Sequence, residues 1–266
     1  HRVVPRQFSK IGHSFVFDTE EVVVGTKDMP FEDYIYLRGL SFVIVVFFSA
    51  AEFRPLKRFM IEYNIGIDKW ISFIHENISA YPEVHRQYLA FMKDTEDELF
   101  VHHSDLIGFY QKPENYEALE SGRLGDNLLR KYKQILLYES YDSCLDLAVF
   151  AAEKIIDNHS KDKMINNLAR YQSFRNIRSY ISDKNVYVDQ EVVLEYDIPD
   201  WLDNQDSKCR LEDFEDTVSY LVSHTDTSKQ LFQSIIDMNK DLTLSLQVLY
   251  RDGSIRDYWP VWSKQN

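Results

Sequence analysis

The hydrophobic pattern of the chain is dominated by an apolar run from Leu40 to Ala51. Burying a large apolar side chain stabilises a fold by roughly 1.5–3 kcal/mol, so we expect this run to be shielded from water over most of its surface. Phe31, Tyr34 and Leu37 precede it at helical spacing, which favours a buried central helix. Its many valines and isoleucines leave a buried strand as the alternative. Crossing a bilayer takes about 20 apolar residues, so no membrane span is expected.

The rest of the pattern predicts amphipathic helices and a few strands. Pro55 should kink or break the helical region around it, because proline lacks the backbone donor that a helix interior needs. A hairpin is expected within residues 1–29, with its turn at 18–21. Two strands joined at 189–190 are expected within 186–194, and a hairpin with its turn at 252–253 is expected within 242–262. Helices are expected at about 56–63, 68–77, 82–99, 126–157 (two helices), 162–177, 211–223 and 226–239.

These elements together predict a mainly α fold. We expect a multi-helix, bundle-like domain with small β-hairpin elements at its N- and C-terminal ends. Composition shifts near residue 183, so we expect a hairpin and helical body over residues 1–182 and a smaller α/β subdomain over 183–266.

Composition narrows the classes of function. Hydrophobic residues make up 44% of the 266 residues, with 8 glycines and 7 prolines, which is typical of a globular helical chain. The net charge of −13 opposes binding to nucleic acids and to anionic membranes. Two cysteines, Cys144 and Cys209, give neither a disulfide framework nor a metal-ligand spacing, and a reducing, cytoplasmic compartment is expected. No signal peptide is visible, and the chain does not begin with Met, so we expect a fragment or processed product.

Motifs for catalysis are mostly absent. The chain has no glycine-rich phosphate loop, no Gly-x-Ser-x-Gly, no His-Glu-x-x-His and no Cys-x-x-Cys. His102, His103 and Asp105 are the nearest approach to a metal or acid–base site, because adjacent histidines ligate a metal where a loop bends suitably. No third ligand lies at a suggestive spacing, so a polar turn at the end of the preceding helix is the preferred interpretation, and no catalytic, cofactor-binding or metal residue is assigned.

Aromatic residues next to prolines provide a second set of candidates. Trp201 follows Pro199, and Trp259 and Trp262 flank Pro260. Such groups line binding grooves or anchor loops to a core, and core anchoring is preferred here. Arg54, Lys57 and Arg58 form a small basic patch, for which a solvated face is preferred over an anion site.

Two blocks of the sequence resemble a known family. One runs from Val22-Val23-Val24-Gly25-Thr26 through Met29-Pro30-Phe31-Glu32-Asp33-Tyr34 and Arg38-Gly39-Leu40 to Phe53-Arg54-Pro55-Leu56. The other is Glu195-Tyr196-Asp197-Ile198-Pro199-Asp200-Trp201-Leu202. They resemble the region that follows the barrel in cobalamin-binding radical SAM enzymes, which carries an entry of the type T-x-x-M-(S/P)-F-E-(D/E)-Y and a D-(I/V)-P-x-W-L element. The resemblance covers about residues 15–75 and 190–202.

What the resemblance implies is an accessory C-terminal domain that is inactive alone. It would cover the barrel mouth, help to shape the substrate site of a methyltransferase- or cyclase-like enzyme, or mediate association. The parent would bind a 4Fe-4S cluster, S-adenosylmethionine and cobalamin, and the partners would be its missing N-terminal domains and a small-molecule substrate. The family's Cys-x-x-x-Cys-x-x-Cys motif is absent from this chain, so no cofactor role transfers to any residue.

Two other functions remain open. One is a helical protein-interaction or ligand-binding module without redox chemistry. The other, which is least favoured, is a metalloenzyme that uses His102, His103 and Asp105. If an apolar helix normally packs against a missing part, we expect it to leave an exposed apolar patch on this chain.

Overall fold

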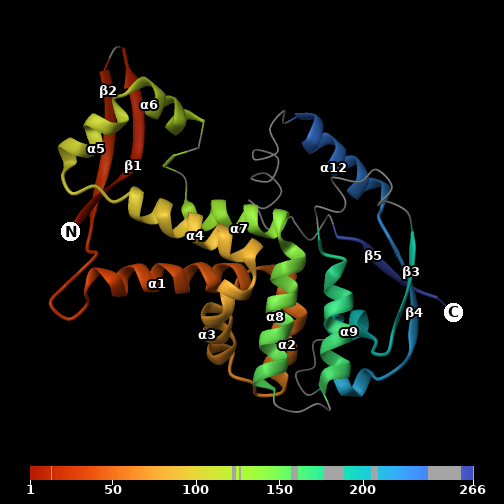
Figure 1. Ribbon diagram of the computed structural model, residues 1–266. Coiled ribbons are helices and arrows are strands. Elements are labelled where there is room, and N and C mark those ends of the chain that lie inside the picture. Colours follow the sequence, from red (N-terminus) through yellow and green to blue (C-terminus); the bar gives the residue numbers. More distant parts are fainter. Residues whose placement is uncertain are drawn as a thin grey trace. The chain divides into compact units, whose positions relative to one another are not determined.

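A computed structural model describes residues 1–12, 14–121, 124–125, 127–156, 161–176, 189–204, 209–238 and 259–265. Helices dominate the described chain, and the strands form a two-stranded and a three-stranded antiparallel sheet (Figure 1). This confirms the predicted mainly α fold with small β elements toward both ends.

The α-helices are α1 (Phe31–Val43), α2 (Arg54–Glu62), α3 (Ile67–Asn77), α4 (Pro82–Asp97), α5 (His103–Tyr110), α6 (Pro113–Glu120), α7 (Leu128–Glu139), α8 (Tyr141–Ile155), α9 (Asp162–Ser173), α11 (Ile198–Asp203) and α12 (Asp226–Met238). A π-helix spans Ile44–Phe48, and 3-10 helices span Ala51–Phe53, Ile78–Ala80 and Leu211–Phe214. The strands are β1 (Arg2–Ile11), β2 (Ser14–Val22), β3 (Gln190–Leu194), β4 (Val218–Ser223) and β5 (Val261–Lys264).

The chain divides into two compact units, each built from two separate segments. Unit 1 comprises His1–Phe42 and Arg86–Tyr132, and unit 2 comprises Val43–His85 and Lys133–Asn266. This division differs from the predicted boundary at residues 182 and 183, because the segment 133–182 belongs with the C-terminal residues. The sequence-based boundary followed a change of composition, whereas the units follow which residues touch.

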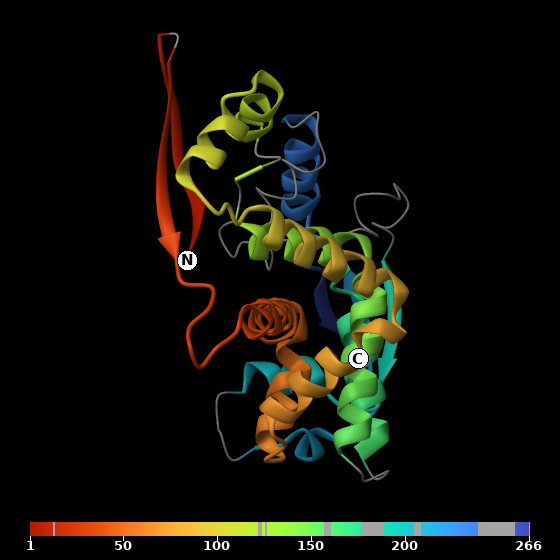
Figure 2. The ribbon, with the colours of Figure 1, turned by 60° about the vertical axis from the view of Figure 1, so that its left-hand side comes forward.

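Unit 1 begins with a long β-hairpin that packs on α5 and α6 (Figures 1 and 2). The hairpin reverses between Ile11 and Ser14, where Gly12 has a φ of 62°. The predicted turn at residues 18–21 is therefore wrong, because these residues continue β2 and pair with β1. The left-handed backbone of Gly12, which costs glycine little, places the reversal there.

The hydrophobic core of unit 1 lies between the hairpin and these two helices. A two-way backbone pairing joins Val3 to Phe100, with N···O distances of 2.8 and 3.0 Å. The buried residues of this core are Val3, Phe17, Leu106, Tyr110, Tyr116 and Leu119. Large aromatic groups thus supply much of the burial that holds the hairpin in place.

Helix α1 follows a tight turn that Thr26 organises. Its hydroxyl accepts hydrogen bonds from the backbone N–H groups of Asp28 and Met29, at 3.2 and 3.1 Å. Further along α1, a side chain at Gly39 would meet the Tyr88 hydroxyl of α4. Any larger residue there would require the Tyr88 ring to shift, so glycine suits this close approach.

The predicted central helix is present, but it ends earlier and is more exposed than expected. It continues from α1 into the π-helix and stops at Ser49, before Pro55, which lies in the first turn of α2. Proline is tolerated there because the first N–H groups of a helix have no intrahelical partner.

Among the described residues, no single helix is long and apolar enough to span a membrane. Only Phe31–Phe48 and Ala51–Glu62 together meet that criterion, and a bend of 58° separates them.

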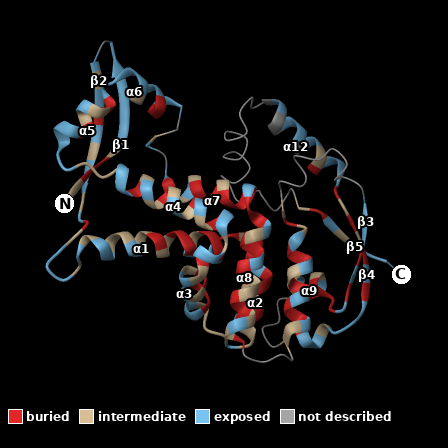
Figure 3. Ribbon diagram, in the orientation of Figure 1, coloured by how far each residue is buried: buried red, intermediate tan, exposed pale blue. Residues whose placement is uncertain are grey.

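Unit 2 is built around α8, whose inner face is entirely buried (Figure 3). Small side chains on that face let other helices approach closely, and Trp70 of α3 donates its indole N–H to the Ala148 carbonyl at 2.9 Å. Phe53 stacks on Tyr141 at 6.0 Å between ring centroids. Cys144 is fully buried here, as expected from its apolar neighbours.

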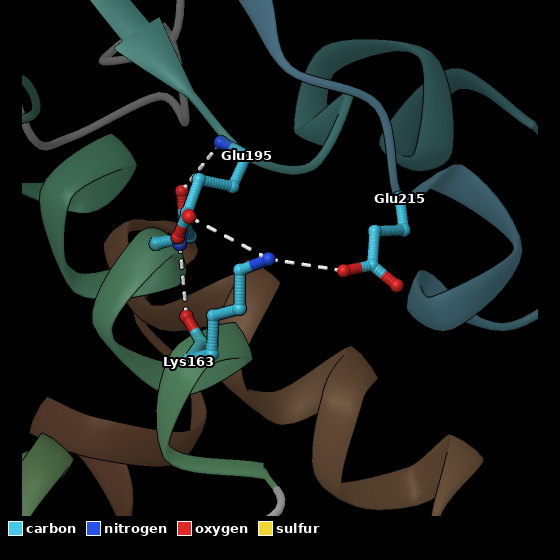
Figure 4. Close-up of polar contacts among 4 residues, drawn as sticks. Lys163, Glu195 and Glu215 are labelled. Carbon is cyan, nitrogen blue, oxygen red and sulfur yellow. Dashed lines mark hydrogen bonds and ion pairs between the residues drawn. The ribbon is translucent and has the colours of Figure 1, made fainter.

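Polar contacts attach the end of β3 to α9 (Figure 4). The Asn167 side chain accepts from the Glu195 backbone N–H at 2.9 Å and donates to the Glu195 carboxylate at 3.2 Å. Lys163 lies between the Glu195 and Glu215 carboxylates, at 3.5 and 3.0 Å. Ion pairs of exposed groups contribute little to stability, so the amide–backbone contact is the more specific link.

The C-terminal predictions had mixed outcomes. The helix expected at 211–223 is wrong, because a short 3-10 helix is followed by β4, in which Val218, Tyr220 and Val222 are buried alternately. A period of two buries one face of a strand, and the six-residue pattern was too short to separate from a helix. Strand β3 and helix α12 are confirmed, but Gln190, which was expected in a turn, is the first residue of β3 and pairs with Val222. The rest of the strand region predicted at 186–194, and most of that at 242–262, lie outside the described residues, although β5 pairs with β4.

Candidate functional site

A cavity of about 270 Å³ lies within unit 1. It is lined by residues of the hairpin, of α1, of the turn after α4 and of the segment at the start of α7. Its polar lining is formed by Tyr34, Arg38, Glu98 and Asn127, and its apolar lining includes Val4, Val22, Leu128 and Leu129. Tyr34 and Arg38 belong to the first resemblance block, so that block contributes to a concave polar surface.

Arg38 is the most distinctive group in this cavity. Its guanidinium lies over the Phe91 ring, with 5.5 Å between the Arg38 Cζ and the ring centroid. Its Nε is buried and has no hydrogen-bond partner among the described residues. Because this Nε has almost no accessible surface, a ligand in the cavity would have to contact the terminal N–H groups of the guanidinium instead, and these favour an anionic acceptor.

The start of α7 borders the same cavity. Asn127 caps this helix, accepting from the Arg130 N–H at 3.1 Å through its side-chain oxygen. The following residues, Leu128 and Leu129, line the cavity in the first turn. First-turn N–H groups have no intrahelical acceptor and carry the positive end of the helix dipole, which favours a negative group nearby.

His102, His103 and Asp105 lie elsewhere, at the start of α5. His102 is the N-cap residue of that helix, and His103 Nδ1 is 3.1 Å from the Thr19 hydroxyl of β2. Among the described residues, no group of three or more His, Cys, Asp or Glu side chains is arranged to hold a metal ion. The structure thus places these residues at the beginning of a helix rather than in a turn that closes the preceding one.

A buried polar cluster occupies unit 2, where α2 begins. Glu52 is 2% exposed, and its Oε1 has no hydrogen-bond partner among the described residues. Burial raises the pKa of Glu52, while its own backbone N–H, Lys133, Arg175 and Lys57 oppose that rise. The Arg175 guanidinium donates to the carbonyls of Ala51 and Glu52, at 2.9 and 3.1 Å. The cluster therefore holds a carboxyl whose neutral form is favoured by its surroundings.

Gln172 of α9 completes this cluster. Its side-chain oxygen accepts from the Leu56 N–H in the first turn of α2 at 3.2 Å, and its carbonyl accepts from the Tyr141 hydroxyl at 2.7 Å. The Gln172 side chain thus satisfies a backbone N–H in the first turn of α2 that has no partner within that helix. The Tyr141 hydroxyl in turn satisfies the Gln172 carbonyl near the end of α9. These bonds give the cluster a clear structural role.

Lys57 points inward rather than forming part of a basic surface patch. Its ammonium donates to the Ala50 carbonyl at 2.9 Å and to the Phe48 carbonyl, at the end of the π-helix. Arg58 is likewise engaged, with Glu62 at 2.7 Å and with the Trp201 ring below it. Arg54 remains exposed. The basic residues are thus divided between the interior and the surface.

Lys57 should titrate at an unusually low pH. Burial lowers its pKa from 10.5 to about 8, although Glu52 raises it in part. Because the folded value lies below the unfolded one, protein stability should rise with pH between about 8 and 10.5, and Lys57→Met should lack this rise. NMR of reductively ¹³C-methylated protein should show one lysine signal with a midpoint near 8, absent from Lys57→Arg. A signal that titrates only above pH 10 would contradict the assignment.

The aromatic candidates differ in burial. Trp201 is fully buried, which confirms core anchoring for that residue. Trp262 is partly buried against Tyr171 and Tyr220, at 4.7 and 5.6 Å between ring centroids. The Arg175 guanidinium lies over the Trp259 ring at 4.2 Å. All three tryptophans are therefore engaged by the protein itself.

Sequence reasoning missed both Arg38 and Glu52. Arg38 belongs only to a resemblance block, and Glu52 directly follows the apolar run from Leu40 to Ala51. A single charged residue next to such a run was the available signal, because its neighbours have to be buried.

Comparisons with known proteins found no match: neither a family model, nor a curated protein, nor a solved structure corresponds to the chain.

Proposed function

We propose that the chain is the accessory C-terminal domain of a cobalamin-dependent radical SAM enzyme, methyltransferase- or cyclase-like, and that it shapes the substrate side of the barrel. The two resemblance blocks carry this proposal. Each block has a defined structure. The first contains the Thr26 turn and the helix that follows it, and the second contains a capped helix in which Trp201 is buried.

Exposed apolar side chains on the central helix support a docking role. Ile44 and Phe48, both in unit 2, are 38% and 43% exposed. Both lie in the π-helix, whose hydrogen bonds span five positions, so a separation of four positions places them near one face of it. A stripe of this kind is typical of a surface that contacts another part of a protein.

The cofactors of such a parent do not fit this chain. A 4Fe-4S cluster is held by cysteine thiolates. The chain has two cysteines, and burial raises the pKa of the Cys144 thiol well above its usual value. We therefore assign cluster, S-adenosylmethionine and cobalamin binding to other parts of the parent polypeptide, and this chain contributes only surface and substrate contacts.

The test is the reading frame that encodes the chain, together with the association state of the isolated chain. We expect a Cys-x-x-x-Cys-x-x-Cys motif upstream of the His1 codon. Sedimentation should show self-association of the isolated chain that Ile44→Ser with Phe48→Ser abolishes, whereas Leu89→Ser, a change at another exposed apolar residue, leaves it intact. A complete frame without the motif would contradict the enzyme assignment.

The same stripe favours a second candidate function. A helical interaction module without redox chemistry would also present an apolar helix face to a partner helix. That function would be supported if the frame lacks the cysteine motif while the Ile44 and Phe48 changes still abolish association.

A further inference from the structure

The size of the unit 1 cavity limits what it can hold. Its volume of about 270 Å³ lies just below the range of about 300–1,000 Å³ that is typical of small-molecule pockets. The cavity therefore suits a small ligand.

One part of the cavity lining, around Arg38, favours an anionic group of the ligand. Arg38, which lines the cavity, carries a guanidinium that lies over the Phe91 ring, with 5.5 Å between its Cζ and the ring centroid. Arginine matches a carboxylate in geometry, because two parallel N–H groups reach the two oxygens. The first turn of α7, which also lines the cavity, adds positive potential.

The lining also contains a negative group, Glu98 of the turn that follows α4. A simple anion would be repelled by this carboxylate, which weakens the case for phosphate or acetate. A carboxylate offers about four acceptor positions, so Glu98 can accept from a ligand in addition to its contacts with the protein. Val4 and Val22 complete the lining with apolar surface.

We propose that this cavity binds a small zwitterionic aminocarboxylate, with its carboxylate on Arg38, its ammonium on Glu98 and its carbon chain against Val4 and Val22. The inference concerns unit 1 alone and does not depend on the radical SAM proposal. The cavity would bind the same ligand if the chain belonged to an enzyme of another class or to a protein without catalytic activity.

Calorimetric titration of the whole chain tests the proposal with four probes: 4-aminobutanoate, L-valine, butanoate and inorganic phosphate. At least one of the two amino acids should bind saturably at millimolar concentrations and more tightly than butanoate or phosphate. Absence of saturable binding by both amino acids overturns the proposal. Equal or tighter binding of phosphate overturns it too, since the site would then be a plain anion site.

Two variants test which residue binds each end of the ligand. Arg38→Gln should weaken amino-acid binding at least about tenfold, because charge-assisted hydrogen bonds are lost. Glu98→Gln should remove the preference for the amino acid over butanoate. Arg54→Gln, at an exposed arginine outside the cavity, is the matched control and should bind as the unaltered protein does.

Circular dichroism and thermal unfolding establish that each variant is folded. If Arg38→Gln does not fold, the four-probe comparison and Glu98→Gln still decide the proposal. An unchanged preference in folded Glu98→Gln would overturn the role of Glu98, and equal weakening by Arg54→Gln would show nonspecific binding.

Discussion

Trp201→Ala is expected to lower the free energy of unfolding by about 3–5 kcal/mol. The indole is fully buried and donates its N–H to both carboxylate oxygens of Glu62, at 3.2 and 3.1 Å. The Arg58 guanidinium lies over the ring, 4.5 Å from its centroid. Truncation would leave a cavity, remove a donor from a partly buried carboxylate and remove the surface on which Arg58 stacks.

Urea unfolding followed by circular dichroism measures this loss. Trp201→Phe is the matched control, because it keeps most of the volume and loses only the N–H donor; it should cost about 1–2 kcal/mol. A double-mutant cycle with Glu62→Gln isolates the indole–carboxylate contact. A loss of under about 1 kcal/mol for Trp201→Ala would mean that the second resemblance block does not anchor α11.

Asp197→Ala should destabilise the protein by about 3 kcal/mol, because it removes a buried acceptor shared by three donors. The carboxylate accepts from the Lys264 ammonium at 2.8 Å, from the Asp200 N–H at 3.1 Å and from the Tyr220 hydroxyl. These donors belong to β5, α11 and β4. One side chain therefore caps a helix and fastens two strands of the sheet.

The effect of Asp197 should depend on pH. Burial alone would raise the pKa of Asp197, but hydrogen bonds from Lys264, Tyr220 and Asp200 hold it below the usual 3.8. Because the folded pKa is the lower one, its contribution is fully present above about pH 3.8 and is lost as the pH falls through the folded value. The difference in unfolding free energy between the unaltered protein and Asp197→Asn should shrink over that acidic range.

Chemical denaturation between pH 2 and pH 7 measures this difference. Asp200→Asn serves as the control, because Asp200 contributes its backbone N–H rather than its carboxylate to the Asp197 contact. A difference that stays constant down to the lowest pH would show that the Asp197 carboxylate does not interact with its donors as the structure places them.

The sequence predicted the elements better than their contacts. Helix α12 and a hairpin within residues 1–29 were predicted from local patterns, although the turn of the hairpin was misplaced, and the burial of Cys144 followed from its apolar neighbours. Core anchoring of Trp201 was preferred because it lies beside Pro199. Strand β4 was missed because its six-residue alternation is shorter than the window that separates strand from helix.

Local sequence patterns could not predict the candidate site. Arg38 and Glu98 are sixty positions apart in the sequence, and only folding brings them to one cavity. The burial of Glu52 likewise depends on Arg175, which lies more than a hundred positions away and donates to the adjoining carbonyls. Such pairings carry no periodic signal, so a single sequence can mark a charged residue beside an apolar run but cannot identify its partner.

Each unit is built from two separate segments of the chain, and this has a consequence for synthesis on the ribosome. Unit 1 cannot form until residue 132 has been made, since its second segment begins only after residues 43–85. That intervening stretch belongs to unit 2 and must wait for residues beyond 132 to find its partners. Its apolar helices would stay exposed during this interval, when nascent chains are most prone to aggregate. Truncation after residue 132 would therefore yield a chain that contains all of unit 1 and an unpartnered apolar insertion.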